Sequence, residues 1–472
     1  MNRIITTVKI IALLFITTTL CNANIINVPS NYPTIQSAIN ASVNNDTIAV
    51  APGTYFENIN FRGKNIVLTS LFYLTGDTNY IYNTIINGSQ PLNPDSASCI
   101  IFNSGEDSTA VLQGFTITGG HGTKWDDEHG AGVYREGGGV IIQYSSPVIQ
   151  HNLIVNNEAI DIAGVSGAGG GGIRTGDGNP KILNNTICYN QGKYGEGIVL
   201  NFTGGTVKNN LICYNSGGST FGAASVWSNG SATQSRIIEN NTITNNNALN
   251  GTAGFYASQT SGYQLLINNI IYDNYSTTTP SQIQKYGASP TTVAYCNVGN
   301  GGYPGNGNIS LSSSFSDTNY FYLNASSACV DAGDSTAIYN DLTVTGTTAL
   351  FPSMGGLRND IGAYGGQGAS WLPSANPIIL SINNIDLNEN YFSISPNPVL
   401  SAATISFILK QNENVQLSIS DINGKNMLTL ENKNLNIGTH TYTLDRKTLK
   451  AGIYFCNLKT DKNSWSKKLI VE

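Results

Sequence analysis

A short motif recurs six times between residues 147 and 298 and constrains the fold more than any other feature. Each copy places an apolar residue three positions before an Asn and another two positions after it, as in Ile149, Asn152 and Ile154. The Asn recurs after 33, 25, 31, 28 and 28 residues, and the last copy, at Asn297, is degenerate. A period of this size is typical of stacked units that bury their apolar faces only against one another.

The composition of the repeat favours strands over helices. The copies are too short for a helical hairpin and too rich in Asn, Gly and Thr to favour helix. The apolar positions are predicted to point inward, and the Asn to form a turn, because Asn tolerates left-handed backbone and bonds its own backbone. Stacked copies would form a ladder of Asn side chains. A second Asn stands five positions on in most copies, at Asn157, Asn190, Asn215, Asn246 and Asn274. We therefore predict an all-β chain with a right-handed parallel β-helix over residues 24–370.

The start of this region has the features of a solenoid cap. Residues 32–40 predict a short amphipathic helix whose Ile35, Ala38 and Ile39 would cover the open end of the solenoid. The segment at residues 46–68 resembles the opening coil of pectin-lyase-like β-helix proteins. This resemblance implies the fold and leaves the activity open.

The far end of the region carries an Asp- and Gly-rich pair of segments. Residues 329–334 and 359–364 resemble the closing module of many secreted bacterial β-helices. Their aspartates could in principle hold Ca²⁺. Turn and cap chemistry is the favoured interpretation, since Asp next to Gly commonly forms turns.

The first 23 residues predict export. Arg3 and Lys9 precede an apolar run at residues 10–16, and small residues end the segment at Ala23. This pattern is typical of a secretory signal peptide, here residues 1–23. No later segment approaches the length of a membrane span, so we expect a secreted or surface protein that first reaches the periplasm.

The last 80 or so residues resemble a known sorting domain. Strand-like segments alternate with turns such as Asn423–Gly424, which predicts a small antiparallel sandwich at residues 391–472. The matching motifs are residues 395–398, 417–425, 438–444, 449–455 and 467–472, and they resemble the C-terminal sorting domain of the type IX secretion system. The resemblance implies type IX secretion machinery as a partner, passage across the outer membrane, and release or surface attachment. An ordinary binding module is the alternative, and residues 371–390 are the predicted linker.

Charge is scarce and unevenly distributed. Residues 24–390 carry 11 Lys and Arg against 23 Asp and Glu, whereas residues 391–472 carry 10 against 6. Nucleic-acid binding requires a basic surface. The acidic larger part therefore argues against nucleic acid as a partner.

Ionisable and aromatic residues gather in a loop at residues 119–136. Its carboxylates could bind Ca²⁺ or supply an acid/base pair for glycosidic cleavage, and a cation there could abstract a proton in a lyase. A solvated surface loop is the alternative, because adjacent carboxylates in a loop point in different directions. The candidate catalytic residues are Asp126, Asp127, Glu128, Lys124 and His129; the candidate substrate-binding residues are Trp125, Tyr134 and Arg135; the candidate calcium ligands are Asp126 and Asp127.

The order of motifs argues against familiar enzymes of this fold. Polygalacturonase-like hydrolases place an Asp–Asp pair before Gly–His–Gly, whereas here residues 120–122 precede Asp126 and Asp127. Signatures of methylesterases and pectate lyases do not match either. We therefore expect a carbohydrate-binding or adhesive surface protein. The alternatives are a polysaccharide lyase or glycoside hydrolase acting at residues 119–136, and a structural surface protein without a defined ligand.

Cysteines and tyrosines are predicted to stack on neighbouring coils. Cys188 and Cys213 both stand three residues after the repeated Asn, so they could form a disulfide or a simple ladder of thiols. An aromatic path for a glycan is a further prediction, for which packing is the alternative. The residues of that path are Tyr134, Tyr144, Tyr189, Tyr214 and Trp227.

Overall fold

The chain folds into two units, residues 1–376 and residues 377–472. The computed structural model describes residues 23–375, except 128, 160, 220–224, 231–234, 259–261, 288–289 and 345. It also describes residues 392–471, except 396–398, 400–401, 410–411, 422–423, 437 and 462–463. The predicted signal peptide up to residue 22 and residues 376–390 of the predicted linker lie outside the described residues.

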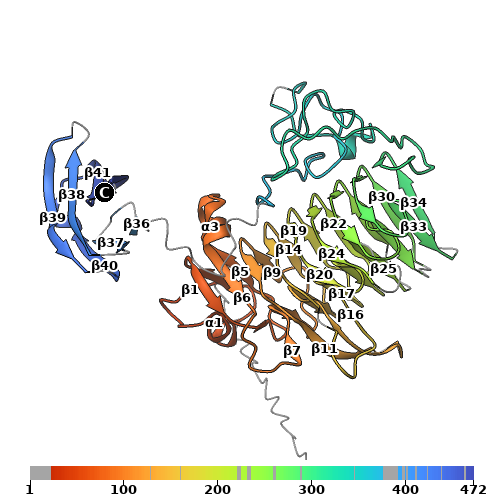
Figure 1. Ribbon diagram of the computed structural model, residues 1–472, viewed down its shortest axis with the longest axis horizontal. Helices are drawn as coiled ribbons and strands as arrows, with labels where there is room; N and C mark the ends of the chain where they lie inside the picture. The colour runs from red at the N-terminus through yellow and green to blue at the C-terminus, as the bar shows by residue number, and fades with distance from the viewer. Residues whose placement is uncertain are drawn as a thin grey trace, which may run out of the picture. The chain divides into compact units, whose positions relative to one another are not determined.

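The described residues of the first unit form three long parallel sheets, which are the walls of a solenoid (Figure 1). Sheet A contains β1 (Ile25–Val28), β2 (Thr47–Val50), β5 (Val67–Ser70), β9 (Val111–Gln113), β14 (Val148–Gln150), β18 (Lys181–Leu183), β22 (Gly205–Lys208), β26 (Arg236–Glu239), β30 (Gln264–Ile267) and β34 (Thr291–Ala294). Sheet B contains β3 (Gly53–Phe56), β6 (Thr84–Asn87), β10 (Thr116–Thr118), β15 (Leu153–Val155), β19 (Thr186–Cys188), β23 (Leu211–Cys213), β27 (Thr242–Thr244), β31 (Ile270–Tyr272) and β35 (Asn297–Val298). Sheet C contains β4 (Ile59–Asn60), β8 (Ile100–Phe102), β13 (Val140–Gln143), β17 (Ile173–Gly176), β21 (Ile198–Asn201), β25 (Val226–Asn229), β29 (Phe255–Ser258) and β33 (Ile283–Tyr286).

Two smaller sheets extend the coils. Sheet D contains β7 (Ser96–Ala97), β11 (Gly122–Asp127), β12 (Gly132–Glu136) and β16 (Gly167–Gly169). Sheet E contains β20 (Gln191–Gly192), β24 (Ser216–Gly217), β28 (Asn247–Ala248) and β32 (Tyr275–Ser276). The predicted parallel β-helix is confirmed.

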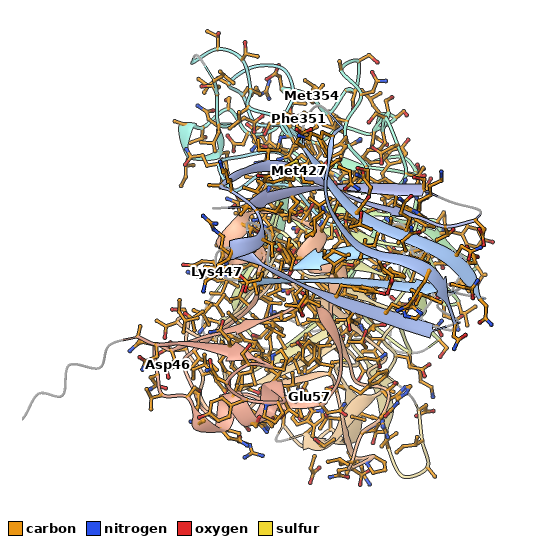
Figure 2. The ribbon with its side chains drawn as sticks, turned by 90° about the vertical axis from the view of Figure 1, so that its left-hand side faces the viewer. Asp46, Glu57, Phe351, Met354, Met427 and Lys447 are labelled. Carbon is orange, nitrogen blue, oxygen red and sulfur yellow. The ribbon has the colours of Figure 1, made fainter. Side chains whose placement is uncertain are left out.

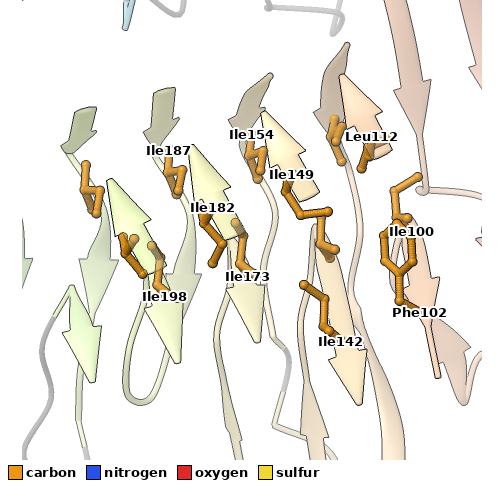
Figure 3. Packing of buried hydrophobic residues seen from close by; sticks show 14 of the residues in the cluster. Ile100, Phe102, Leu112, Ile142, Ile149, Ile154, Ile173, Ile182, Ile187 and Ile198 are labelled. Atoms are coloured by element: carbon orange, nitrogen blue, oxygen red, sulfur yellow. The ribbon is translucent and has the colours of Figure 1, made fainter. Parts of the chain in front are cut away.

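Columns of aliphatic side chains fill the interior of the solenoid. Each sheet contributes at least one inward residue per coil, and most strands of sheet C contribute two, as Ile100 and Phe102 do; each is stacked in register on the residue of the next coil (Figure 3). Burying one such side chain stabilises the fold by about 1.5–3 kcal/mol, so the stacked coils share one cooperative core. The columns include Leu112, Ile149, Ile182 and Val207 in sheet A; Ile117, Ile154, Ile187 and Ile212 in sheet B; and Ile100, Val140, Ile173 and Ile198 in sheet C.

The predicted Asn ladder stands at the turn between sheets A and B. Each Nδ2 donates to the Oδ1 of the Asn in the next coil at 3.0–3.1 Å, along Asn152, Asn185, Asn210, Asn241 and Asn269. A second ladder runs through Asn157, Asn190, Asn215, Asn246 and Asn274. The left-handed residue of the first turn is the one before the ladder Asn, with φ of 50° to 57°, at His151, Asn184, Asn209, Asn240 and Asn268.

A short helix covers the first coil. Helix α1 (Ile35–Ala41) begins with a capping box at Thr34 and buries the predicted apolar residues, Ile35, Ala38 and Ile39. The carboxylate of Glu57 (Figure 2) accepts hydrogen bonds from the first two backbone N–H groups of the helix at 2.9 Å each. This acceptor satisfies amides that a helix leaves free at its start. Two further short helices, α2 (Phe72–Thr75) and α3 (Asn79–Asn83), lie in the chain between β5 of sheet A and β6 of sheet B.

Residues 299–375, the closing segment, return along the outside of sheet B. Its successive parts form hydrogen bonds to successively earlier coils. The N–H of Asp334 donates to Oδ1 of Asn268 at 2.8 Å, Nδ2 of Asn240 donates to the carbonyl of Asp360 at 2.9 Å, and Nδ2 of Asn209 donates to the carbonyl of Ala363 at 2.9 Å. The hydroxyl of Thr186 donates to the carbonyl of Pro373 at 2.5 Å, and the N–H of Ser374 donates to the hydroxyl of Tyr82 at 2.6 Å. Outward residues of sheet B, such as Thr186 and Leu211, are therefore buried. The segment clamps coils that would otherwise contact only their neighbours.

The aspartates of the closing segment accept backbone hydrogen bonds. Asp331 accepts from the N–H of Gly356 at 2.9 and 3.0 Å, and Asp360 accepts from the N–H groups of Asp331 and Met354 at 2.8 and 2.7 Å. This arrangement is the turn and cap chemistry that the sequence favours. The segment also contains the short helix η1 (Ala337–Tyr339).

The second unit is a small antiparallel sandwich. One sheet contains β36 (Phe392–Ser395), β37 (Ala402–Leu409) and β40 (Gly438–Asp445). The other contains β39 (Asn426–Leu435), β38 (Glu413–Asp421), β41 (Gly452–Lys459) and β42 (Ser464–Val471), and the short helix η3 (Arg446–Thr448) connects β40 to β41. Alternate residues pack into one core, which includes Ile405, Phe407, Leu417 and Leu458. None of the helices in the described residues has the length and apolar character needed to span a membrane.

Candidate functional site

The outer face of sheet C carries an aromatic and polar row. Side chains alternate between the two faces of a strand, so the residue after each core residue points outward. In register these outward residues are Arg174, Val199, Trp227 and Tyr256, and the next outward row contains Asn201, Asn229, Ser258 and Tyr286. Sheet C therefore provides a floor of large rings beside amide and hydroxyl groups.

A hairpin formed by β11 and β12 lies against this floor. Trp125 pairs with Tyr134 across the hairpin, and Asp127 pairs with Gly132. The alternation along β11 leaves Lys124 and Asp126 exposed and Asp127 buried. The adjacent carboxylates Asp126 and Asp127 thus point to opposite faces of the hairpin.

The base of the hairpin is attached to the floor by a buried ion pair. Glu136 accepts from Nε of Arg174 at 2.9 Å, and the two side chains are 4% and 0% exposed. Glu136 also accepts from Nε1 of Trp125 at 2.9 Å and from the hydroxyl of Tyr194 at 2.5 Å. The guanidinium of Arg174 lies 3.8 Å from the ring centroid of Trp125, a cation–π contact. Burial and the nearby Glu136 carboxylate raise the pKa of Tyr194 well above its ordinary value.

The tip of the hairpin is attached where strands β17 and β21 of sheet C end. Nε2 of His129 lies 3.1 Å from Asp177, and its ring stacks on Phe202 with centroids 3.5 Å apart and planes 10° apart. Asp177 and Phe202 directly follow β17 and β21 and have left-handed φ values of 48° and 49°. Residues other than Gly, and bulky ones above all, rarely adopt this conformation.

The hairpin and the floor enclose a cleft of about 480 Å³. Its size is within the range of small-molecule and cofactor sites, about 300–1,000 Å³. Trp227 and Tyr256 are each 8% exposed at its floor, and their rings form one apolar cluster with Tyr134, Tyr194 and Val199. The lining residues are Asp127, His129, Ala131, Tyr134, Glu136, Tyr194, Asn201, Phe202, Trp227, Asn229, Tyr256, Ser258 and Tyr286.

The structure brings together some of the sequence-predicted candidates and separates others. Asp127, His129 and Tyr134 line the cleft. Trp125 packs on Arg174 beside it, and Arg135 turns away, donating to the carbonyls of His121 and Pro94 at 2.8 Å each. Lys124 and Asp126 are exposed on the far face of the hairpin, and Glu128 lies outside the described residues. Among the described residues, no three His, Cys, Asp or Glu side chains converge to hold a metal ion.

The floor of the cleft was largely absent from the sequence prediction. Trp227 and Tyr134 of the predicted aromatic path do lie together. Tyr189 and Tyr214 stack on each other elsewhere, with centroids 5.1 Å apart, and Tyr214 packs on Phe321 of the closing segment. A signal for the floor exists in the sequence, because its outward residues follow Gly-apolar pairs, as Arg174, Val199 and Tyr256 do.

The two repeat cysteines stack as expected. Cys188 and Cys213 are register partners on β19 and β23, and both are buried free thiols. Burial raises the pKa of both well above the ordinary value. They are part of the wall that the closing segment covers.

Comparison with known families identifies the second unit. Residues 393–472 match the family model described as secretion system C-terminal sorting domain. No curated protein matches the chain at a significant level. The fold and this match define the class: an exported or cell-surface β-solenoid protein. More particularly, the chain is a parallel β-helix that carries the sorting domain handled by the type IX secretion machinery.

Proposed function

We propose that this exported protein binds a neutral glycan chain in the cleft over sheet C. The observation that supports this proposal is the combination of aromatic rings with amide and hydroxyl groups in one cleft. Sugar rings present C–H faces that pack on aromatic rings and hydroxyls that bond to amides. The rings are those of Tyr134, Tyr194, Phe202, Trp227, Tyr256 and Tyr286, and the polar groups are those of Asn201, Asn229 and Ser258.

The charges in the cleft favour a neutral ligand over an anionic one. Among the described lining residues there is no Lys or Arg, whereas Asp127 and Glu136 are acidic. Glu136 is already paired with Arg174 outside the lining, but a uronate or sulfate group would meet Asp127 without a lining Lys or Arg to offset the repulsion. A glycan without acidic groups meets no such penalty.

Two exposed tyrosines make a matched test. Tyr286 lines the cleft and is 57% exposed, whereas Tyr275 on β32 is 62% exposed and outside the cleft. The purified protein is titrated by calorimetry with neutral plant, algal and microbial oligosaccharides. Tyr286→Ala should weaken binding about tenfold, equal to about 1.4 kcal/mol, and Tyr275→Ala should leave it unchanged. Absence of binding to every neutral glycan, or equal effects of the two variants, would overturn the proposal.

Glycoside cleavage is the second candidate function. It is favoured by one observation, the presence of Asp127 and Glu136 in the same cleft, because glycosidases use two carboxylates. Binding is preferred, since Glu136 is already engaged by Arg174, Trp125 and Tyr194. New reducing ends that are released by the protein and abolished in Asp127→Asn would establish cleavage instead.

A further inference from the structure

We infer that the cleft receives the end of a glycan chain and not a stretch of its interior. This inference rests on the proposed function and specifies how the ligand lies. It follows from the hairpin of β11 and β12, which closes the cleft at one end, and from the open opposite end of sheet C.

The closure begins at β17. Arg174 occupies the same outward row as Trp227 and Tyr256. The indole of Trp125 covers its guanidinium at 3.8 Å, so that Arg174 is 0% exposed, whereas Trp227 and Tyr256 line the cleft. This row is therefore covered at β17 and at β21, where Val199 is also 0% exposed, and it lines the cleft from β25 onward; in the next row the lining begins at Asn201 of β21.

The closure extends along the length of the strands. Near the start of β17 the buried Glu136 holds the base of the hairpin to Arg174. Beyond the ends of β17 and β21 His129 holds the tip to Asp177 and Phe202. The hairpin is thus a bridge with both ends attached.

A second cavity lies on the other side of this bridge. It measures about 210 Å³ and is lined by Ile101, Asn103, Thr123, Trp125, Ile141, Gln143 and Tyr144. It shares no lining residue with the main cleft. Trp125 therefore stands between two separate spaces, and a chain in the main cleft does not continue into the second cavity.

The opposite end of the cleft faces the last coil. Tyr286 stands on β33, which has no further strand beside it in sheet C of the described residues. From β21 to β33 there are three strand intervals of about 4.8 Å, or about 14 Å, the length of about three hexose rings. A chain that enters past Tyr286 must therefore end at the hairpin.

The test compares chain ends with chain interiors of the same sugar. A neutral hexaose that binds the protein is compared by calorimetry with its long polymer and with hexaoses that carry a bulky tag at one end or the other. We expect equal half-saturation per mole of chain for hexaose and polymer, and at least tenfold weaker binding for one of the two tagged hexaoses. Affinity per chain that rises with chain length, together with equal binding of both tagged hexaoses, would overturn the inference and leave glycan binding intact. Failure of every hexaose to bind would overturn the proposed function itself.

Two histidines provide a matched pair of variants for the bridge. His129→Ala removes the attachment of the tip, whereas His121→Ala removes a surface pair with Glu158 outside the cleft; the two imidazole side chains are 33% and 31% exposed. His129→Ala should raise binding of the polymer relative to the hexaose at least threefold, and His121→Ala should not change the ratio. An unchanged ratio in both variants would contradict closure by the hairpin.

Discussion

Asn210 is a central rung of the first Asn ladder, and its replacement by Ala should strongly destabilise the solenoid. Its Nδ2 donates to the carbonyls of Ile182 and Lys208 at 2.8 and 3.0 Å and to Oδ1 of Asn241 at 3.0 Å. Its Oδ1 accepts from the backbone N–H and from Nδ2 of Asn185 at 2.9 and 3.0 Å. The side chain is 0% exposed, so that bulk water does not reach these partners.

The magnitude follows from which groups lose their partners. A hydrogen bond contributes about 1 kcal/mol net, and a buried group without a partner costs about 1–3 kcal/mol. Nδ2 of Asn185 keeps its bonds to two carbonyls, whereas its backbone N–H loses the side-chain acceptor. The unpaired backbone N–H of Asn185 and the other lost bonds together should lower the free energy of unfolding by about 3–5 kcal/mol in Asn210→Ala.

Urea unfolding followed by circular dichroism measures this loss. With a slope of about 3 kcal/mol per molar urea, the midpoint should fall by about 1 M or more. Asn247→Ala is the control, since Asn247 belongs to the coil that follows and its side chain is exposed; its effect should stay within about 0.5 kcal/mol. A midpoint for Asn210→Ala that matches the control would refute the assignment of stability to the ladder.

Two further predictions concern buried charge. Burial, with the nearby Asp360 charge as a smaller cause, raises the pKa of Asp341 to about 8, and burial raises that of Asp360 to about 7. The two neutral, protonated carboxyls therefore stabilise the folded state. This contribution to the free energy of unfolding is complete below pH 3.8, the ordinary pKa of Asp, and is lost as the pH rises through 7 to 8. The thermal midpoint should therefore fall between pH 5 and pH 9, and less so in Asp341→Asn; scanning calorimetry that shows the same slope in both proteins would count against this. Glu136→Gln leaves Arg174 buried without a counter-charge and should cost about 3–5 kcal/mol in denaturant unfolding. Adding Arg174→Met should recover part of the loss, and a double variant less stable than Glu136→Gln would contradict the reasoning.

The repeat could be predicted from the sequence because each coil forms the same local structure. Ile149, Asn152 and Ile154 mark the end of one strand, the turn and the next strand, and the same spacing recurs in coil after coil. A stacked ladder follows from that spacing without knowledge of any distant contact. The sorting domain was predictable for a similar reason, since its motifs occur in order over residues 393–472.

The candidate site was only partly predictable. The sequence drew attention to residues 119–136, and Asp127, His129 and Tyr134 do line the cleft. Trp227 and Tyr256 were harder to place, because coils of 25 to 33 residues shift the outward positions by different amounts along the sequence. Their alignment depends on the register between strands.

Tertiary structure alone decided where the insertions lie. The hairpin is placed by Glu136 on Arg174 and by His129 on Asp177, residues 38 and 48 positions apart in the chain. The closing segment is likewise placed by contacts such as that of Asn240 with Asp360, 120 positions away. A repeat encodes its own next copy, whereas these segments occur once and take their direction from surfaces that exist only after the coils have stacked. The sequence by itself therefore determined the solenoid and its export tail, and the folded solenoid determined the cleft.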